Sequence, residues 1–211
     1  MNLSGKRVIV MGLGRFGGGA GAARFCAQRG ANVLVTDLAG RDQLAQSLTQ
    51  LQDLPIEYRL GEHRECDFTT ADLIVVNPAI NPRNNPYLHA AARARIPTTS
   101  EIRLLVAHLP DRRRTIGVTG TAGKSTVVAM IGHILRQAVG PDRVHVGSNI
   151  GGSLLDKLPA IQNDHWIVLE LSSFMLDSLD QDAWSPGTAV VTNFAPNHLD
   201  WHGRVEDYTT A

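Results

Sequence analysis

The sequence has 211 residues, long for one domain and sufficient for two, and 43% of them are hydrophobic, enough to fill a core in each. There are 20 lysines and arginines and 20 aspartates and glutamates, so the net charge is zero. This excludes a protein whose overall charge attracts it to nucleic acid or to an anionic membrane, and it favours a small-molecule partner. Two cysteines, Cys26 and Cys66, make no disulfide framework and no apolar run approaches a membrane span, so we expect a cytoplasmic location.

Short β-branched runs alternate with helical stretches in the first half of the chain. Strands are predicted at 7–11, 32–36 and 72–76, where the apolar run is continuous, as in parallel sheets buried on both faces. Between them, 18–30 and the alanine-rich 86–96 have helical character. This alternation predicts an α/β fold.

A glycine-rich loop, MGLGRFGGG, follows the first predicted strand. Gly12, Gly14 and Gly17 form the pattern G-x-G-x-x-G at the start of a helix, and Asp37 closes the second strand, where dinucleotide folds place an acid that binds a ribose hydroxyl. Small residues let the backbone approach a diphosphate, whose charge then lies at the helix N-terminus. Any nucleotide diphosphate fits this description, so NAD is not specified. The alternative is a turn without a ligand, capped by Asp37.

The loop NPAINPRNNP (77–86) follows the third predicted strand at its carboxyl end, where ligands lie in open α/β sheets. Its three prolines and four asparagines make it rigid and polar. It is therefore either part of a ligand site or a solvated connector.

A charged, proline-containing break, HLPDRRRT (108–115), separates these elements from a new strand-loop-helix unit. We place the domain boundary there, which gives domains 1–110 and 111–211. The elements predicted in the second domain are strands at 115–119, 166–171 and 188–193 and a helix at 125–139.

The segment VTGTAGKST (118–126) raises the question of a nucleotide-phosphate loop. The strict pattern G-x-x-x-x-G-K-[ST] requires glycine at position 118, where this chain has valine. The features that phosphate binding needs remain: Gly120 and Gly123 allow tight turns, and Lys124 can reach phosphate oxygens. Ser125 and Thr126 add hydroxyls for Mg²⁺. The strand-turn-helix context favours a phosphate loop over a surface turn with an ordinary lysine.

Candidate metal ligands follow the last two predicted strands. Glu170 in VLELSSF lies near the end of a buried strand, where an unpaired carboxylate is costly; its partner is either Mg²⁺, shared with Ser125, or an arginine. In NHLDWHG (197–203), His198, Asp200 and His202 alternate like one face of a strand. These histidines are either metal ligands or ordinary loop histidines.

Four motifs together resemble one known family. GVTGTAGKST, GSNIGG, LELSSF and TNFAPNHLDWHG, in this order and spacing, are similar to the central ATPase domain of the Mur ligases, whose phosphate loop typically reads G-T-N-G-K-[ST]. The resemblance accounts for the missing first glycine and implies that the loop binds ATP, with Ala122 where the family usually has asparagine. The ATP-binding residues implied are Gly120, Thr121, Ala122, Gly123, Lys124, Ser125 and Thr126.

The first half resembles the Rossmann-like uridine-nucleotide-binding domain of the D-glutamate-adding branch of this family, through MGLGRFGGG, VTD and VVNPAINPRNNPYLHAAARARIPTTSEIRLL. The resemblance implies that the glycine loop approaches the UDP diphosphate, that Asp37 faces the uracil, and that residues 77–80 border the sugar nucleotide. The UDP-sugar-binding residues implied are Gly14, Arg15, Phe16, Gly17, Asp37, Asn77, Pro78, Ala79 and Ile80.

The reaction implied by the resemblance is an ADP-forming amide ligation in peptidoglycan precursor synthesis. ATP would phosphorylate the carboxylate of UDP-N-acetylmuramoyl-L-alanine, and the amino group of D-glutamate would attack the acyl phosphate. By the same resemblance, Lys124 contacts the β- and γ-phosphates, Ser125 and Glu170 hold Mg²⁺, and His198 is a ligand of a second Mg²⁺. Asn149 lies near the γ-phosphate and the carboxylate. ATP and Mg²⁺ are the expected cofactors, and we expect a monomer.

The chain stops at VEDYTTA, one residue before the position where the family has a lysine that serves the second metal. The family's third domain, which binds the incoming amino acid, would also be missing. We therefore expect an N-terminal fragment with a truncated second domain that is inactive alone. The rival interpretations are another Mur ligase, adding L-alanine or a diamino acid, an NAD-dependent oxidoreductase, and a nucleotide-binding module without catalysis.

Overall fold

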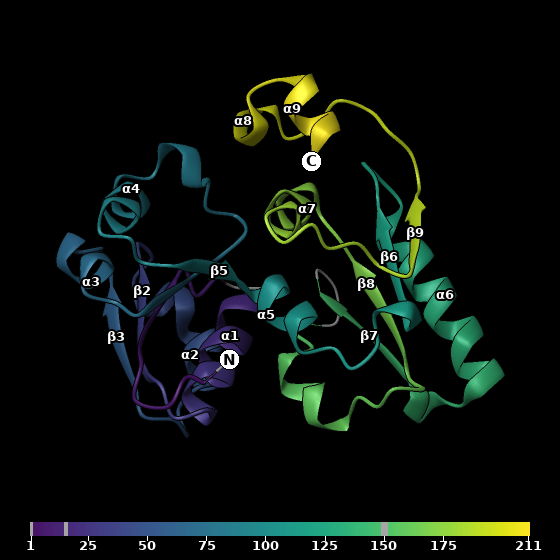
Figure 1. Ribbon diagram of the computed structural model, residues 1–211, viewed down its shortest axis with the longest axis horizontal. Helices are drawn as coiled ribbons and strands as arrows, with labels where there is room; N and C mark the ends of the chain where they lie inside the picture. Colours follow the sequence, from purple (N-terminus) through teal and green to yellow (C-terminus); the bar gives the residue numbers. More distant parts are fainter. Residues whose placement is uncertain (1, 15–16, 149–151) are drawn as a thin grey trace. The chain divides into compact units, whose positions relative to one another are not determined.

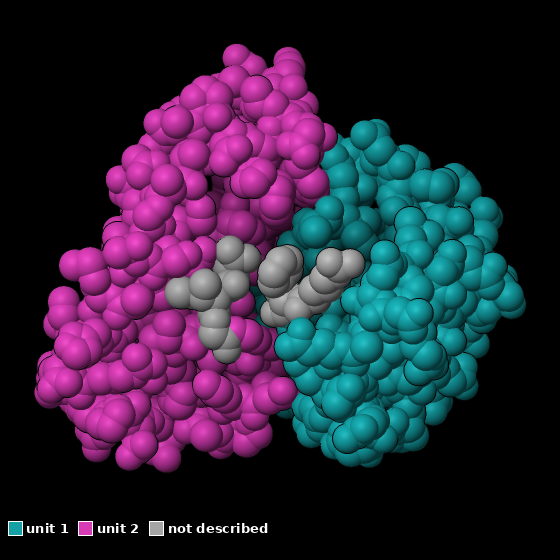
Figure 2. Space-filling model, turned by 180° about the vertical axis from the view of Figure 1, so that it is seen from behind, with its two compact units in different colours: residues 1–104 teal, residues 105–211 magenta. Residues whose placement is uncertain are grey.

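The computed structural model describes residues 2–14, 17–148 and 152–211. The chain divides into two compact units, Met1–Leu104 and Leu105–Ala211 (Figure 2). The division falls within α5 (Glu101–Ala107), a few residues before the boundary placed after residue 110 from the sequence. The roles assigned to the two domains stay predictions. Each unit contains one parallel sheet.

The first unit has a five-stranded sheet in the order β3-β2-β1-β4-β5 (Figure 1). Its strands are β1 (Arg7–Met11), β2 (Asn32–Asp37), β3 (Ile56–Leu60), β4 (Leu73–Val76) and β5 (Thr98–Ser100), and its helices are α1 (Gly18–Gln28), α2 (Ala45–Thr49), α3 (Glu65–Thr69) and α4 (Pro86–Arg93). This order is that of the first five strands of a Rossmann sheet. The chain changes direction across the sheet between β1 and β4, so the loops after these two strands flank the topological switch point.

The core of the first unit follows from the apolar runs of its central strands. β1 is buried apart from its first residue, and Ile9 and Met11 pack with Leu34 and Ile74 from the neighbouring strands. Phe68, at the end of α3, is completely buried in the same cluster. Strands that are covered on both faces need such continuous apolar sequences.

A buried carboxylate ties α3 to two strands of the first sheet. Asp67 is almost fully buried; its Oδ1 accepts a hydrogen bond from Arg7 at 3.0 Å and its Oδ2 accepts one from Arg59 at 2.6 Å. Arg7 belongs to β1 and Arg59 to β3. The two guanidinium groups supply the paired donors that a buried carboxylate requires.

The second unit has a four-stranded parallel sheet in the order β7-β8-β6-β9 (Figure 1). Its strands are β6 (Thr115–Thr119), β7 (Val144–Ser148), β8 (Trp166–Glu170) and β9 (Thr188–Val191), and its helices are α6 (Lys124–Val139), α7 (Ser173–Asp180), α8 (Leu199–His202) and α9 (Val205–Thr210). Because β6 lies between β8 and β9, the loop after β6 is flanked by the loops that follow both neighbours. Among the described residues, no helix has the length and hydrophobicity that crossing a membrane requires.

The predicted α/β class with parallel sheets is confirmed in both units. The prediction missed β3, β5 and β7, and all three are edge strands. An edge strand is paired on one side only, so it needs no continuous apolar run: no residue of IEYRL in β3 is fully buried. The first unit positions the loops after β1 and β4, and the second unit positions those after β6, β8 and β9.

Candidate functional site

The glycine loop after β1 lies against the loop after β4 in the first unit. The side-chain amide of Asn77 donates to Gly12 O at 3.2 Å, while Asn77 N donates to Met11 O at 2.9 Å, which extends the pairing of β1 with β4. Ile80 N in turn donates to Asn77 O at 2.9 Å. The structure thus brings Gly14, Asn77 and Ile80 of the predicted sugar-nucleotide set to one place. Arg15 and Phe16 of that set lie outside the described residues.

Gly19 is part of the same turn, and the sequence pattern did not single it out. A Cβ at this position would collide with the carbonyl oxygens of Gly12 and Leu13. Glycine therefore lets the start of α1 approach the glycine loop closely, which is the role of small residues in a diphosphate-binding turn. The run of three glycines at 17–19 is the signal from which this role could have been read.

The carboxylate of Asp37 is hydrogen-bonded to backbone amides around the glycine loop. Its Oδ2 accepts from Leu13 N at 2.8 Å and from Gly14 N at 3.3 Å, and its Oδ1 accepts from Ala39 N at 2.8 Å. This is the turn-capping role that the sequence left open for an acid at the end of β2. The two loop amides are engaged by the carboxylate, so a diphosphate would be held by other donors of the loop and α1. The uracil contact implied for Asp37 stays a prediction.

His63 lies beside the end of β2, and the sequence analysis did not select it. Thr36 Oγ1 is 3.1 Å from Glu62 O, to which it donates, and 2.7 Å from His63 Nδ1. A hydroxyl has one proton, so donation to the Glu62 carbonyl makes His63 Nδ1 the donor to Thr36. Burial lowers the pKa of His63, and the nearby Asp37 carboxylate partly opposes that shift. A neutral imidazole with this tautomer leaves its Nε2 as an acceptor.

The second glycine loop connects β6 to α6 in the second unit. Gly120 has a φ of 126° and Gly123 a φ of 81°, values that residues with side chains rarely adopt. Lys124 Nζ donates to Gly120 O at 2.7 Å and to Thr121 O at 3.1 Å, so its ammonium lies across the loop. Ser125 and Thr126 are exposed in the first turn of α6, where backbone N–H groups have no intrahelical partner.

The segment after β9, residues 192–195, which we call the clasp segment, is hydrogen-bonded to the phosphate loop. Asn193 Nδ2 donates to Ala122 O at 2.9 Å, and Asn193 Oδ1 accepts from Ala122 N at 3.0 Å. Thr192 Oγ1 also donates to Ala122 O, at 2.6 Å, and Thr121 N donates to Asn193 O at 3.1 Å. Ala122, the position where the resembling family usually has asparagine, thus has both of its backbone polar groups engaged.

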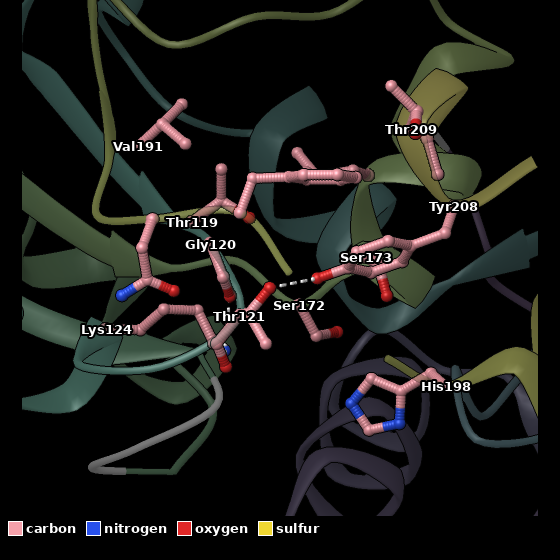
Figure 3. A pocket seen from close by; sticks show the side chains of 14 residues that line it. Thr119, Gly120, Thr121, Lys124, Ser172, Ser173, Val191, His198, Tyr208 and Thr209 are labelled. Carbon is pink, nitrogen blue, oxygen red and sulfur yellow. Dashed lines mark hydrogen bonds between the residues drawn. The ribbon is translucent and has the colours of Figure 1, made fainter. Parts of the chain in front are cut away.

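Thr121 extends these contacts to α9. Its hydroxyl donates to Ala195 O at 2.9 Å and accepts from Ala195 N at 2.9 Å, which makes Tyr208 OH, also at 2.9 Å, the donor to Thr121 (Figure 3). The ring of Tyr208 stacks on Phe194, with 5.5 Å between the centroids. The sequence analysis missed Tyr208 because nothing in its local pattern indicates a partner 87 residues away.

Glu170 is the last residue of β8 and is only 2% exposed. In the sheet it lies opposite Val118 of β6 on one side and Ser148 of β7 on the other. This register places its carboxylate at the carboxyl edge of the sheet, beside the strand that leads into the phosphate loop. Asn149, the candidate that follows Ser148, lies outside the described residues.

The alternation predicted for 198–202 was wrong. His198 has a positive φ of 51° and precedes α8, so Asp200 and His202 lie on a helix and not on a strand face. His202 is buried, and its Nε2 lies 2.9 Å from Ser173 Oγ, whereas His198 is exposed and packs against Phe174 with 4.9 Å between ring centroids. Gly203 ends this short helix at a φ of 86°.

A pocket of about 270 Å³ lies between the phosphate loop, the start of α7, the clasp segment and α9. Its wall includes Lys124, Asn193, His198 and Tyr208, and Figure 3 shows Lys124 and His198 on different sides of it. A lysine cation and a histidine at one pocket suit a ligand with several negative charges. Within the described ranges, no three His, Cys, Asp or Glu side chains are grouped as a metal site.

Two family models match the chain. Residues 6–100 match the model described as Mur ligase MurD-like, N-terminal domain, and residues 118–211 match the Mur ligase middle domain. The first match contains the glycine loop and the 77–86 loop, and the second contains the phosphate loop and the clasp segment.

Curated relatives match over the full chain. The UDP-N-acetylmuramoylalanine--D-glutamate ligase of Roseiflexus sp. (strain RS-1) is 46% identical over 211 residues, and that of Koribacter versatilis (strain Ellin345) is 37% identical over the same length. The matches cover 100% of this chain but 44% and 45% of the two relatives. The chain thus spans less than half the length of the curated relatives that it matches.

Solved structures show the same fold. The UDP-N-acetylmuramate:L-alanyl-gamma-D-glutamyl-meso-diaminopimelate ligase from Neisseria meningitides matches 98% of this chain and 66% of its own length, with a TM-score of 0.63 and 21% identity. The UDP-N-acetylmuramate-alanine ligase from Thermotoga maritima matches 97% of this chain and 45% of its own length, with a TM-score of 0.57 and 20% identity.

Proposed function

This chain belongs to the Mur ligase family, and on that premise we propose that it provides the sugar-nucleotide and ATP sites of a ligase that joins D-glutamate to UDP-N-acetylmuramoyl-L-alanine with formation of ADP. The observation that carries the proposal is the phosphate loop before α6, with the buried Glu170 one strand away at the same edge of the sheet. Both cysteine thiols are free, which suits the cytoplasm, where we propose that the protein works as a monomer.

The first unit is proposed to bind the uridine diphosphate of the acceptor. Its support is the pair of loops at the switch point, held together by Asn77 and Gly12, because ligands of open α/β sheets lie there. The start of α1 would face the diphosphate, with Gly14 and Gly17 allowing close approach of the backbone. Asp37 would keep the glycine loop in shape through Leu13 and Gly14, in addition to the predicted uracil contact.

The second unit is proposed to bind ATP with Mg²⁺. The residues fit both ligands. The turn at position 120 can be formed only by glycine, and the hydroxyl of Ser125 is exposed at the start of α6. The carboxylate of Glu170 is so buried that it needs a cation or hydrogen-bond donors to be stable. Ser125 and Glu170 would hold the metal, and His198 would be a ligand of a second ion. When bound, Mg²⁺ supplies Lewis-acid stabilisation of charge on the phosphoryl oxygens.

The residues of the chain act by position and charge. Lys124 is proposed to move its N–H donors from the loop carbonyls to the β- and γ-phosphates, which lowers the repulsion between ATP and the acceptor carboxylate. The γ-phosphoryl group would pass to that carboxylate with release of ADP, and the amino group of D-glutamate would displace phosphate from the acyl phosphate to form the amide. Asn149 is proposed to orient the carboxylate and the γ-phosphate.

The test is calorimetric titration of the chain with UDP-N-acetylmuramoyl-L-alanine, UDP and NAD in parallel, and separately with MgATP. We expect binding of the UDP-sugar and of MgATP and no binding of NAD. Lys124→Ala should weaken MgATP binding about 10- to 100-fold, from the loss of charge-assisted hydrogen bonds, and leave the UDP-sugar titration unchanged. Binding of NAD in place of the UDP-sugar would refute the proposal and favour an oxidoreductase.

A further inference from the structure

We propose that Asn193 is a positioning residue for ATP: its side-chain amide fixes the backbone N–H and C=O of Ala122 and thereby sets the shape of the phosphate loop. The inference rests on the function proposed for the second unit. Nothing in the family patterns used above assigns a role to this asparagine.

The geometry of the contact is a two-point amide pair. Asn193 uses both ends of its side chain on one residue, accepting from Ala122 N and donating to Ala122 O at 3.0 and 2.9 Å. The N–H and the C=O of Ala122 belong to the two consecutive peptide units that meet at its Cα, so the pair restrains both units and with them the backbone conformation at Ala122. The second donor on Ala122 O, Thr192 Oγ1, restrains the same carbonyl.

The backbone of the clasp segment is equally close to the loop. Thr192 N donates to Thr119 O at 2.9 Å, which continues the β6–β9 pairing, and Asn193 O accepts from Thr121 N. A Cβ on Gly120 would lie 2.8 Å from Asn193 O and would collide with Thr192 Oγ1. The start of the phosphate loop is therefore held by backbone hydrogen bonds to residues 192–193. The side chain of Asn193 adds two hydrogen bonds at Ala122, further along the loop.

The pairing decides which loop amides are available to a phosphate. The N–H groups of Thr121 and Ala122 are both engaged by Asn193, so they point to the clasp segment and not to a ligand. The donors that remain are those at the start of α6, where Lys124 and Ser125 lie and where the helix dipole favours an anion. Asn193 thus directs the triphosphate to the helix end of the loop and holds the loop ready for it.

Direct evidence would come from amide hydrogen exchange at Ala122, followed by NMR without nucleotide, together with MgATP titration. In the unsubstituted chain we expect a protected Ala122 amide. In Asn193→Ala we expect exchange at least roughly tenfold faster and MgATP binding about tenfold weaker, as the loss of two exposed hydrogen bonds implies. Asn163→Ala is the matched control, because Asn163 is an exposed asparagine in the turn before β8.

A second variant separates the two ends of the amide. Asn193→Asp keeps an oxygen acceptor for Ala122 N but has no donor for Ala122 O, so the Ala122 amide should stay protected in it. Exchange at Ala122 that is at least roughly tenfold faster in Asn193→Asp than in the unsubstituted chain would contradict the assigned acceptor. This comparison does not need the alanine variant, so it still tests the proposal if that variant fails to fold.

The outcomes separate this inference from the function on which it rests. An Ala122 amide that exchanges at the same rate in Asn193→Ala and in the unsubstituted chain overturns the positioning role, whatever the nucleotide affinity. Unchanged MgATP affinity in a variant with fast Ala122 exchange also overturns it. If the unsubstituted chain binds no MgATP, the proposed function fails, and the positioning role in ATP binding fails with it.

Discussion

Replacing Gly120 by alanine tests whether the phosphate loop is built on the clasp segment. The added methyl group would lie 2.8 Å from Asn193 O and 3.0 Å from Asn193 N, and it would collide with Thr192 Oγ1. Gly123, in the same loop, gives the matched control: its φ is also positive, at 81°, but a Cβ there would meet no atom of the described residues within 4 Å.

The expected magnitudes follow from these two environments. Gly123→Ala should lower the free energy of unfolding by about 1–2 kcal/mol, the cost of a side chain in the left-handed region. Gly120 also has a positive φ, of 126°, so an alanine there carries at least a similar backbone strain. Relief of the collision with residues 192–193 adds about 1–3 kcal/mol. Gly120→Ala should therefore lower the free energy of unfolding by about 1–3 kcal/mol more than Gly123→Ala.

Tryptophan fluorescence during urea unfolding is a suitable assay, because Trp166, Trp184 and Trp201 all lie in the second unit and are the only tryptophans of the sequence. The difference in free energy comes from the midpoints, provided that the slope with urea is unchanged. Equal destabilisation by Gly120→Ala and Gly123→Ala would refute the argument, since it would mean that the loop does not rest on residues 192–193.

Three further predictions concern groups outside the pocket. Asp67→Asn should destabilise the first unit by about 2–3 kcal/mol, because an amide replaces a buried charged acceptor of two arginines; urea unfolding followed by circular dichroism measures this, and a loss within 0.5 kcal/mol would contradict it. In the native protein a thiol reagent should modify the exposed Cys66 but not Cys26, whose pKa burial raises to about 12; rapid labelling of both would show that α1 opens. Burial first, and then the nearby His165 and Lys157, lower the pKa of His145 from 6.5, so the folded state disfavours the protonated ring. The second unit should lose stability as pH falls below about 6.5, and His145→Gln should make that dependence shallower; an unchanged slope would contradict the assignment.

The apolar strands and the glycine turns could be predicted from the sequence because each is a local pattern. The runs RVIVM and TIGVT became the central strands β1 and β6, which are covered by neighbours on both sides. VHVGS became the edge strand β7, in which apolar and polar residues mix, so its run gave no comparable signal. The edge strands β3, β5 and β7 were missed for this reason, whereas the apolar run of the edge strand β9 was recognised.

The contacts that shape the sites could not be predicted, because they join residues far apart in the sequence. The turn residues Gly120 and Gly123 could be predicted from their spacing, but the packing of Gly120 against Asn193 could not. The helix at 199–202 was not predicted, and the strand-like alternation of His198, Asp200 and His202 was misleading because a segment of this length fits either period. Glu170 was selected as a carboxylate near the end of a buried strand, and His198 received its role from the family resemblance. The structure adds that His198 is exposed at the pocket and that Glu170 is buried at the carboxyl end of β8.

The long reach of these contacts has a consequence for how the protein is made. Ala122 and Asn193 are 71 positions apart, and Gly12 and Asn77 are 65 apart. During synthesis each glycine loop leaves the ribosome well before the segment that fixes its shape, so closing it costs the entropy of a long intervening chain. We expect each loop to reach its binding shape only after the later strand has joined its sheet. Ligand-binding competence should then appear in two steps during translation, first at the amino-terminal loop and later at the second.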